Sequence, residues 1–188
     1  MKFQVLSAIS CSAAAVALLS ACAGAPMNMS SMPSYSQAAL PAAVQVPAGH
    51  VVALEAVGAG EITYECRDKA GAMGQHDWVF VGPSASLSDR QGRVIGRYFG
   101  PPATWAAMDG SAVTGTQLAV APAGAGNIPL QLVKTNPATG SGAMSGLSHI
   151  QRVATRGGVA PQMVCDGDSK GRREIVKYQA DYIFWKPA

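Results

Sequence analysis

Hydrophobic and polar positions alternate along most of the chain from residue 47 onward. In the clearest stretch Ile62, Tyr64 and Cys66 alternate with polar residues, which is the period of a strand with one buried face. The same reading predicts strands over residues 50–57, 61–67, 77–81, 93–99, 104–108, 113–120, 128–135, 147–155 and 175–185. Glycine-rich breaks are expected to separate them, at Gly58-Ala59-Gly60 and Gly82-Pro83 among others, and Asp109-Gly110 is a strong hairpin signal.

Many short strands without a long amphipathic helix predict an all-β domain. We expect one domain over residues 47–188, either an antiparallel β-sandwich or a small β-barrel, with little or no helix outside a signal peptide. Turns between strands also account for the 21 glycines and 12 prolines. The loop over residues 138–146 is, by its composition, expected to be the most flexible one.

Composition changes this picture at the amino terminus. The chain is 48% hydrophobic but only 13% charged, against a usual charged share of about 25%. Part of the excess lies in residues 1–21, which read as a signal peptide: Lys2 precedes an apolar run over residues 5–19 that is too short to span a membrane. The run ends in Leu19-Ser20-Ala21-Cys22, which resembles the bacterial lipobox and implies lipidation of Cys22. The alternative is ordinary cleavage after Ala25.

The lipobox resemblance predicts where the protein is located. Acylated Cys22 would make the membrane its partner, with the domain in the periplasm or at the cell surface. In lipoproteins generally, Asp directly after the acylated Cys is the usual signal for retention in the inner membrane. Here Ala23 occupies that position, so the outer membrane is favoured. Residues 22–46 carry no charge and no sustained periodicity, and we expect a flexible tether. A net charge of only +3 predicts no nucleic-acid partner.

The four cysteines also fit export. Cys11 would leave with the signal and Cys22 would be lipidated, which leaves Cys66 and Cys165. An exported compartment permits a disulfide between these two, and two buried thiols are the alternative. Neither residue belongs to a C-x-x-C pair, so no metal site is predicted for them.

Several motifs resemble an uncharacterised family, domain-of-unknown-function 3455. The carriers include Ile62-Thr63-Tyr64-Glu65-Cys66, Trp78-Val79-Phe80, residues 150–158 with Ala160-Pro161, and residues 178–184. The resemblance extends over about residues 47–186. It departs near Tyr98, where His is expected, and in the turn over residues 100–105, which is one residue longer than usual. The resemblance implies a shared fold and brings no activity, cofactor or catalytic residue with it.

A low-charge chain with few aromatic residues offers one group of candidate ligand-binding side chains. Aromatic residues can line the mouth of a small barrel, although they more often form core. Arg152 lies between apolar neighbours on a predicted strand, and two alternatives stay open for it: an ion pair with Asp181 or Asp109, or an anionic ligand. The candidate residues are Trp78, Tyr98, Trp105, Arg152 and Tyr182.

The sequence contains no assembled catalytic set, so catalytic residues stay unknown and no cofactor is predicted. Three histidines, His50, His76 and His149, have no diagnostic metal spacing, and no metal site is predicted. We therefore expect a domain of the cell envelope that binds a small molecule or an envelope partner. The alternative is a hydrolase or other enzyme, which requires at least two of His76, Asp77, His149 and Arg152 to converge in one pocket. A structural spacer is a third possibility.

Overall fold

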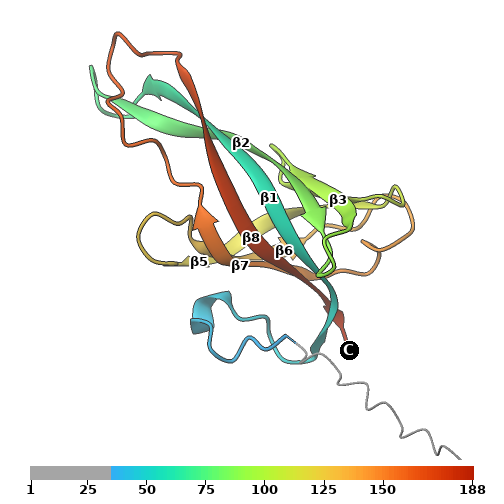
Figure 1. The fold of residues 1–188 in the computed structure, drawn as a ribbon. Helices are drawn as coiled ribbons and strands as arrows, with labels where there is room; N and C mark the ends of the chain where they lie inside the picture. Colours follow the sequence, from blue (N-terminus) through green and yellow to red (C-terminus); the bar gives the residue numbers. More distant parts are fainter. Residues whose placement is uncertain (1–34) are drawn as a thin grey trace, which may run out of the picture. The chain divides into compact units, whose positions relative to one another are not determined.

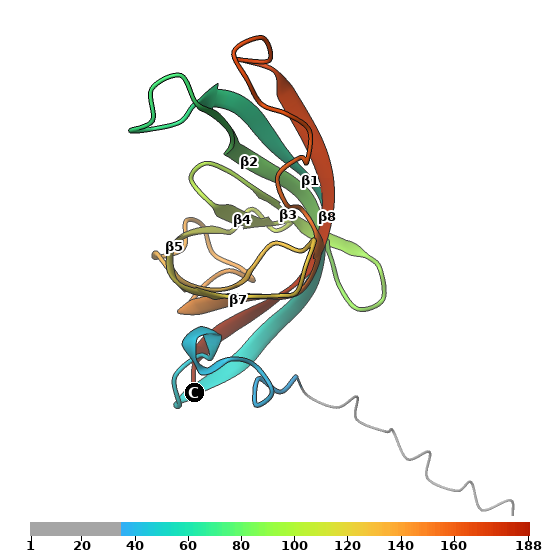
Figure 2. The same ribbon diagram turned by 90° about the vertical axis from the view of Figure 1, so that its left-hand side faces the viewer.

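The computed structural model describes residues 35–188, which form eight antiparallel strands in chain order. Each strand pairs with the next one, and the last pairs with the first, so the sheet closes into a barrel (Figures 1 and 2). The strands are β1 (His50–Asp68), β2 (His76–Ser88), β3 (Val94–Phe99), β4 (Thr104–Ala107), β5 (Ala112–Ala121), β6 (Leu130–Thr135), β7 (His149–Gly157) and β8 (Arg173–Pro187).

The all-β prediction is confirmed, and of its two alternatives the closed barrel is the one observed. Within residues 35–188 the helical structure is a single 3-10 turn, η1 (Ala42–Val44). The hairpin predicted at Asp109-Gly110 joins β4 to β5, and Gly110 has a φ of 88° there, a conformation that favours glycine. In the part of the chain that the structure describes, no helix is long and apolar enough to cross a membrane.

β1 is one continuous strand, so the predicted break at Gly58-Ala59-Gly60 is wrong. These residues pair with β2 and β8 throughout. A Cβ at Gly58 would overlap the ring of Tyr182, and one at Gly60 would overlap the backbone at Ser84. The glycines are needed for close packing inside the barrel, which a sequence reading does not distinguish from a turn.

β2 likewise continues through Gly82-Pro83, where a strand end was predicted. Pro83 pairs with Ile62 of β1, but the pairing of β2 with β3 begins only at Ser84. Pro83 therefore lies where one edge of β2 has no neighbouring strand and where a missing backbone N–H is tolerated.

Two apolar clusters stabilise the barrel from opposite sides of its wall. The larger one fills the interior and includes Trp105, Tyr182 and Phe184. The smaller one lies on the outer wall, where Ile183 and Trp185 pack against Val44 and Val46. Because successive residues of a strand point to opposite faces, β8 contributes Tyr182 and Phe184 to the interior and Ile183 and Trp185 to the outer cluster.

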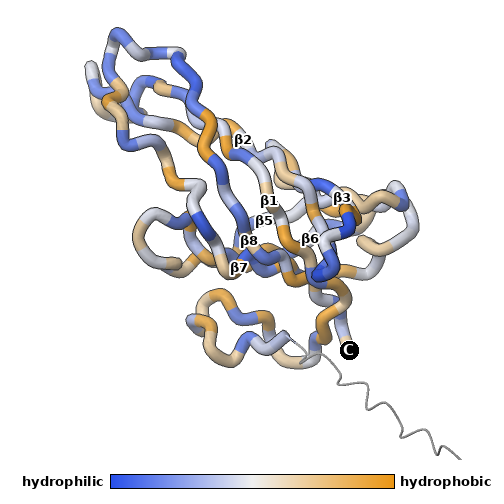
Figure 3. The backbone as a smooth tube through the Cα atoms, in the orientation of Figure 1, coloured by the Kyte–Doolittle hydropathy of each residue, from blue (hydrophilic) through white to orange (hydrophobic). Residues whose placement is uncertain are grey.

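Residues 35–46, here called the strap, pack against this outer wall, although the sequence assigned them to a flexible tether. Val44 is fully buried, and Figure 3 shows the strap as mostly apolar with a few hydrophilic residues. Gln151 of β7 anchors the strap: its Nε2 donates to Val44 O at 2.6 Å and to Gln37 Oε1 at 2.9 Å. The predicted domain boundary at residue 47 therefore excludes a segment that folds with the barrel. The rest of the predicted tether and the signal lie outside the described residues.

The predicted disulfide is present between Cys66 and Cys165, with an S–S distance of 2.05 Å. It joins the end of β1 to the long connection between β7 and β8, across 99 residues of sequence. Here β1, β2 and β8 continue beyond the rest of the barrel, and Figures 1 and 2 show the β1–β2 and β7–β8 connections side by side. The bridge fixes this extension to the connection that packs on it.

Candidate functional site

A partly open cavity of about 360 Å³ lies at the end of the barrel where the β3–β4 and β5–β6 connections are found. One side is apolar and aromatic, with Ile62, Phe80, Pro83 and Ala103. The opposite side is polar, with side chains from three consecutive strands: Gln117 of β5, Gln131 of β6 and Arg152 of β7. The volume falls at the lower end of the range for small-molecule sites.

Arg152 points into the barrel because of its position on β7. Ile150 belongs to the interior cluster, while Gln151 and Val153 face the strap on the outer wall. Alternation along the strand therefore directs Arg152 inward. It pairs in register with Gln131 on one side and with Tyr182 on the other.

The guanidinium of Arg152 bonds to a neutral group. Its Nε and Nη2 donate to Pro129 O at 3.2 and 3.0 Å. Among residues 35–188 no carboxylate forms a salt bridge with it, and no Asp or Glu lines the cavity. The cavity therefore has one positive charge without an acidic neighbour in its lining.

The predicted ion pair of Arg152 with Asp181 or Asp109 is wrong. Asp181 accepts from Arg90 Nη1 at 2.8 Å, and alternation places it on the outer face of β8. Asp109 holds the turn after β4, where it accepts from the N–H and hydroxyl of Ser111 and from the N–H of Ala143. Both carboxylates therefore serve other contacts.

Two glutamines complete the polar side. Gln131 Nε2 donates to Gln117 Oε1 at 2.6 Å across adjacent strands. The pairing leaves the amide N–H groups of Gln117 available to a ligand. Neither glutamine was predicted as a site residue, although Gln131 has the same parity on β6 as inward-facing Val133, and that alternation was the signal available.

Aromatic rings form the floor behind the cavity. Tyr98 stacks on Trp105 with ring centroids 4.7 Å apart, and its ring lies 5.2 Å from that of Tyr182. Tyr98 lines the cavity itself, whereas Trp105 and Tyr182 are fully buried beyond it. The Nε1 of Trp105 is buried without a hydrogen-bond partner. Of the predicted candidates, Tyr98 and Arg152 line the cavity, and Trp105 and Tyr182 support it.

The tyrosines around Arg152 are kept protonated by burial. Burial raises the pKa of Tyr98, raises that of Tyr178 to about 12 and raises that of Tyr182 well above its usual value. The positive charge of Arg152 acts in the opposite direction on each pKa but is the smaller effect. The hydroxyl groups of Tyr178 and Tyr182 bond to each other at 3.3 Å.

Trp78, the remaining candidate, lies elsewhere. It pairs with Cys66 in the extension formed by β1 and β2. Its Nε1 donates to Met163 O at 2.9 Å, so it holds the β7–β8 connection against the barrel. It does not line the cavity.

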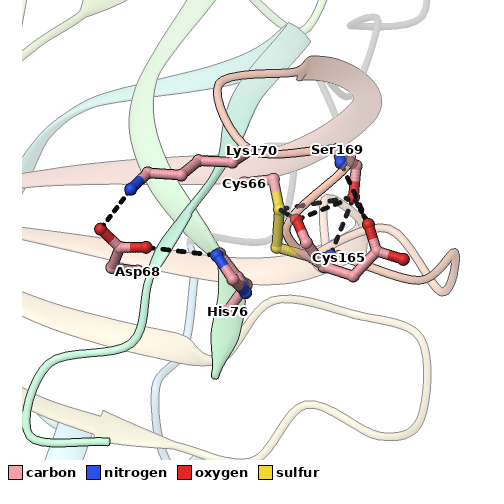
Figure 4. A network of polar contacts seen from close by, with 7 residues as sticks. Cys66, Asp68, His76, Cys165, Ser169 and Lys170 are labelled. Atoms are coloured by element: carbon pink, nitrogen blue, oxygen red, sulfur yellow. Dashed lines mark hydrogen bonds and ion pairs between the residues drawn. A yellow bond between two sulfur atoms is a disulfide. The ribbon is translucent and has the colours of Figure 1, made fainter. Parts of the chain in front are cut away.

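The residues required by the enzyme alternative do not converge. His76 is paired with Asp68 at the end of β1, beside Lys170 and the disulfide, as Figure 4 shows. His149 is the first residue of β7 and lies beside His50 at the opposite end of β1, with the centroids of the two rings 4.8 Å apart. Burial lowers the pKa of His149, assisted by His50 and Lys134. Neither histidine lines the cavity that contains Arg152.

The polar network in Figure 4 has a structural role. Ser169 donates its hydroxyl to Asp166 Oδ1 at 2.7 Å and its N–H to the same oxygen at 3.0 Å, which shapes the loop beside the disulfide. These bonds lower the pKa of Asp166. Within residues 35–188 no group of three or more His, Cys, Asp or Glu is placed to hold a metal ion.

Fold and site together define a small meander β-barrel with an interior cavity. A family model described as "Protein of unknown function (DUF3455)" matches residues 47–186, and the chain belongs to this family. No curated protein and no solved structure matches the chain. The family assignment therefore supplies a shared domain without an activity.

Proposed function

We propose that this chain is an exported, lipid-anchored protein of the cell envelope whose barrel binds a small molecule in the Arg152 cavity. The observation that carries the binding proposal is the cavity itself: an apolar wall faces a polar wall whose one charge has no acidic neighbour. Sites for small ligands commonly combine an apolar surface with a few convergent polar groups.

The proposal of export and anchoring is supported by different residues. The Leu19-Ser20-Ala21-Cys22 motif after an apolar run implies acylation of Cys22 and an outer-membrane location, with the barrel in the periplasm or at the surface. The Cys66–Cys165 disulfide is consistent with an oxidising compartment. The strap begins 13 residues after Cys22, so it would connect the anchored segment to the barrel.

Anchoring is tested by replacing Cys22. In the producing bacterium, wild-type chain should incorporate a fatty-acid label and sediment with membranes, whereas Cys22→Ala should do neither. Cys11→Ala is the matched control, since that cysteine lies inside the proposed signal. Unlabelled wild-type chain would overturn the lipid anchor.

Binding is tested by a thermal-shift screen of metabolites against the full chain and an Ala103→Phe variant. Ala103 lines the cavity, so the larger ring is expected to occupy it. Circular dichroism establishes that the variant is folded. Compounds that raise the melting temperature of the wild type and not of the variant support the proposal. A panel without such a compound would overturn it.

A further inference from the structure

We propose that the cavity selects a small monocarboxylate with an aromatic body, its carboxylate on Arg152 and its ring against Tyr98 and Phe80. This inference rests on the proposed function and names the ligand class of the same site. Four features of the described residues carry it: the free edge of the guanidinium, the single charge, the aromatic wall and the volume.

Among the described residues, the edge of the Arg152 guanidinium formed by Nη1 and Nη2 has no hydrogen-bond partner on one side. A guanidinium has five N–H groups in a fixed fork. Its Nε and one N–H of Nη2 are directed to Pro129 O, which leaves Nη1 and the second N–H of Nη2 side by side. Two parallel donors match the two oxygens of a carboxylate. Because Pro129 O already holds the side chain, less rotamer freedom is lost when the ligand binds.

The charge of the lining favours one negative charge on the ligand. Among residues 35–188, Arg152 is the single charged side chain that lines the cavity. A neutral ligand would leave the guanidinium without an anionic partner, and a dianion would bring a second charge with no counterpart. The amide of Gln117 can add a neutral donor beside Arg152.

The opposite wall favours a flat apolar body. Phe80 is half exposed at the cavity and contacts Tyr64 edge to face, with ring centroids 6.1 Å apart. Tyr98 forms the floor of the cavity, and its ring is held in place by stacking on Trp105. A ligand ring can form offset or edge contacts with these rings. The volume of about 360 Å³ corresponds to roughly a dozen water molecules, which fits a single substituted ring.

The experiment compares benzoate with benzamide, cyclohexanecarboxylate and inorganic phosphate on the full chain, by calorimetry and ligand-observed NMR. We expect benzoate to bind at least tenfold more tightly than its neutral isostere benzamide, and more tightly than the two other anions. Arg152→Gln should reduce benzoate affinity at least tenfold, and Arg152→Lys should reduce it less, because it keeps the charge and loses the fork. Arg156→Gln is the matched control on the same strand, with an exposed side chain, and should leave affinity unchanged.

Each other outcome counts against the inference. Equal affinity for benzoate and benzamide overturns the carboxylate, and phosphate binding as tight as benzoate binding overturns the aromatic body. No binding of benzoate at millimolar concentration overturns the ligand class. The proposed function stands in that case if the metabolite screen still yields compounds that the Ala103→Phe variant excludes, and falls if it yields none.

Discussion

Replacing Gln151 with Ala should detach the strap and lower the stability of the whole domain. The side chain is fully buried between the outer wall of the barrel and the strap. It donates to Gln37 and Val44 and accepts from Trp185 Nε1 at 3.0 Å. No other side chain among the described residues joins the strap to β7 and β8 through this set of bonds.

The magnitude follows from which partners lose their only hydrogen bond. Trp185 Nε1 and Val44 O, both in buried residues, would be left unsatisfied, at about 1–3 kcal/mol each. Gln37 Oε1 keeps a partner, since it also accepts from the N–H of Val46 at 2.7 Å. Water that enters the vacated space restores part of the loss, so we expect about 3 kcal/mol. For a domain of this size that corresponds to a fall in Tm of roughly 6–12 °C.

Urea unfolding followed by circular dichroism gives the free energy, and hydrogen exchange reports on the strap. In Gln151→Ala the amide of Val46 should exchange faster relative to the amides of β1 and β8. Gln162→Ala is the matched control, because Gln162 is exposed and forms a single long bond of 3.4 Å to Ala160 O; it should change stability by less than about 0.5 kcal/mol. A loss below about 1 kcal/mol in Gln151→Ala, with strap exchange as in the wild type, would refute the reasoning.

Two further predictions concern the extension formed by β1, β2 and β8 beside the disulfide. The double variant Cys66→Ala/Cys165→Ala should keep its far-ultraviolet circular dichroism spectrum but lose about 4–5 kcal/mol in urea unfolding, because the bridge closes a loop of about 100 residues. A loss of less than about 1 kcal/mol would contradict this. Hydrogen bonds from Arg67 and Arg173 hold the pKa of Glu65 at about 2, below the usual 4.5. A depressed pKa stabilises the fold above about pH 4.5, and this contribution is lost as the pH falls toward 2. Glu65→Gln should therefore flatten the acid side of the stability profile, and an unchanged slope between these pH values would argue against the interaction.

Local patterns predicted the fold class and several details because these depend on neighbouring residues. Alternation indicated the strands, Asp109-Gly110 indicated the hairpin, and two cysteines in a chain with a predicted export signal indicated the disulfide. The glycines of β1 led to a wrong prediction, because β1 continues through them without a turn. Gly58 looked like part of a turn, yet its lack of a side chain accommodates the ring of Tyr182, which is far away in sequence.

The strap could not be predicted from its own composition. Residues 35–46 are uncharged and aperiodic, which is typical of a linker. Their docking depends on Gln151, more than a hundred residues later, and on the apolar outer faces of β7 and β8. The loop over residues 138–146 is similar: its composition predicted flexibility, but Asp109 binds its backbone and Met144 is buried.

The site was predictable in part for the same reason. Alternation on β7 is enough to separate Gln151 from Arg152, but the partner of an inward arginine depends on which strands lie beside it. Asp181 was a reasonable partner by sequence, and parity on β8 places it outside the barrel, where it binds Arg90. Alternation on β6 indicates that Gln131 faces inward, but its position between Gln117 and Arg152 depends on the pairing of β5 with β6 and of β6 with β7.

The two neighbouring residues Gln151 and Arg152 face opposite sides of one wall, so their functions are separable. Gln151 bonds to the strap and Trp185, while Arg152 bonds to Pro129 O and lines the cavity, and they share no hydrogen-bond partner. Arg152→Gln removes a charge that is unpaired among the described residues, so the folded state loses little and ligand binding loses most. Gln151→Ala should do the reverse: lower stability while the folded fraction keeps wild-type affinity for benzoate. Loss of affinity in folded Gln151→Ala would instead mean that strap docking on the outer wall sets the position of Arg152 inside it.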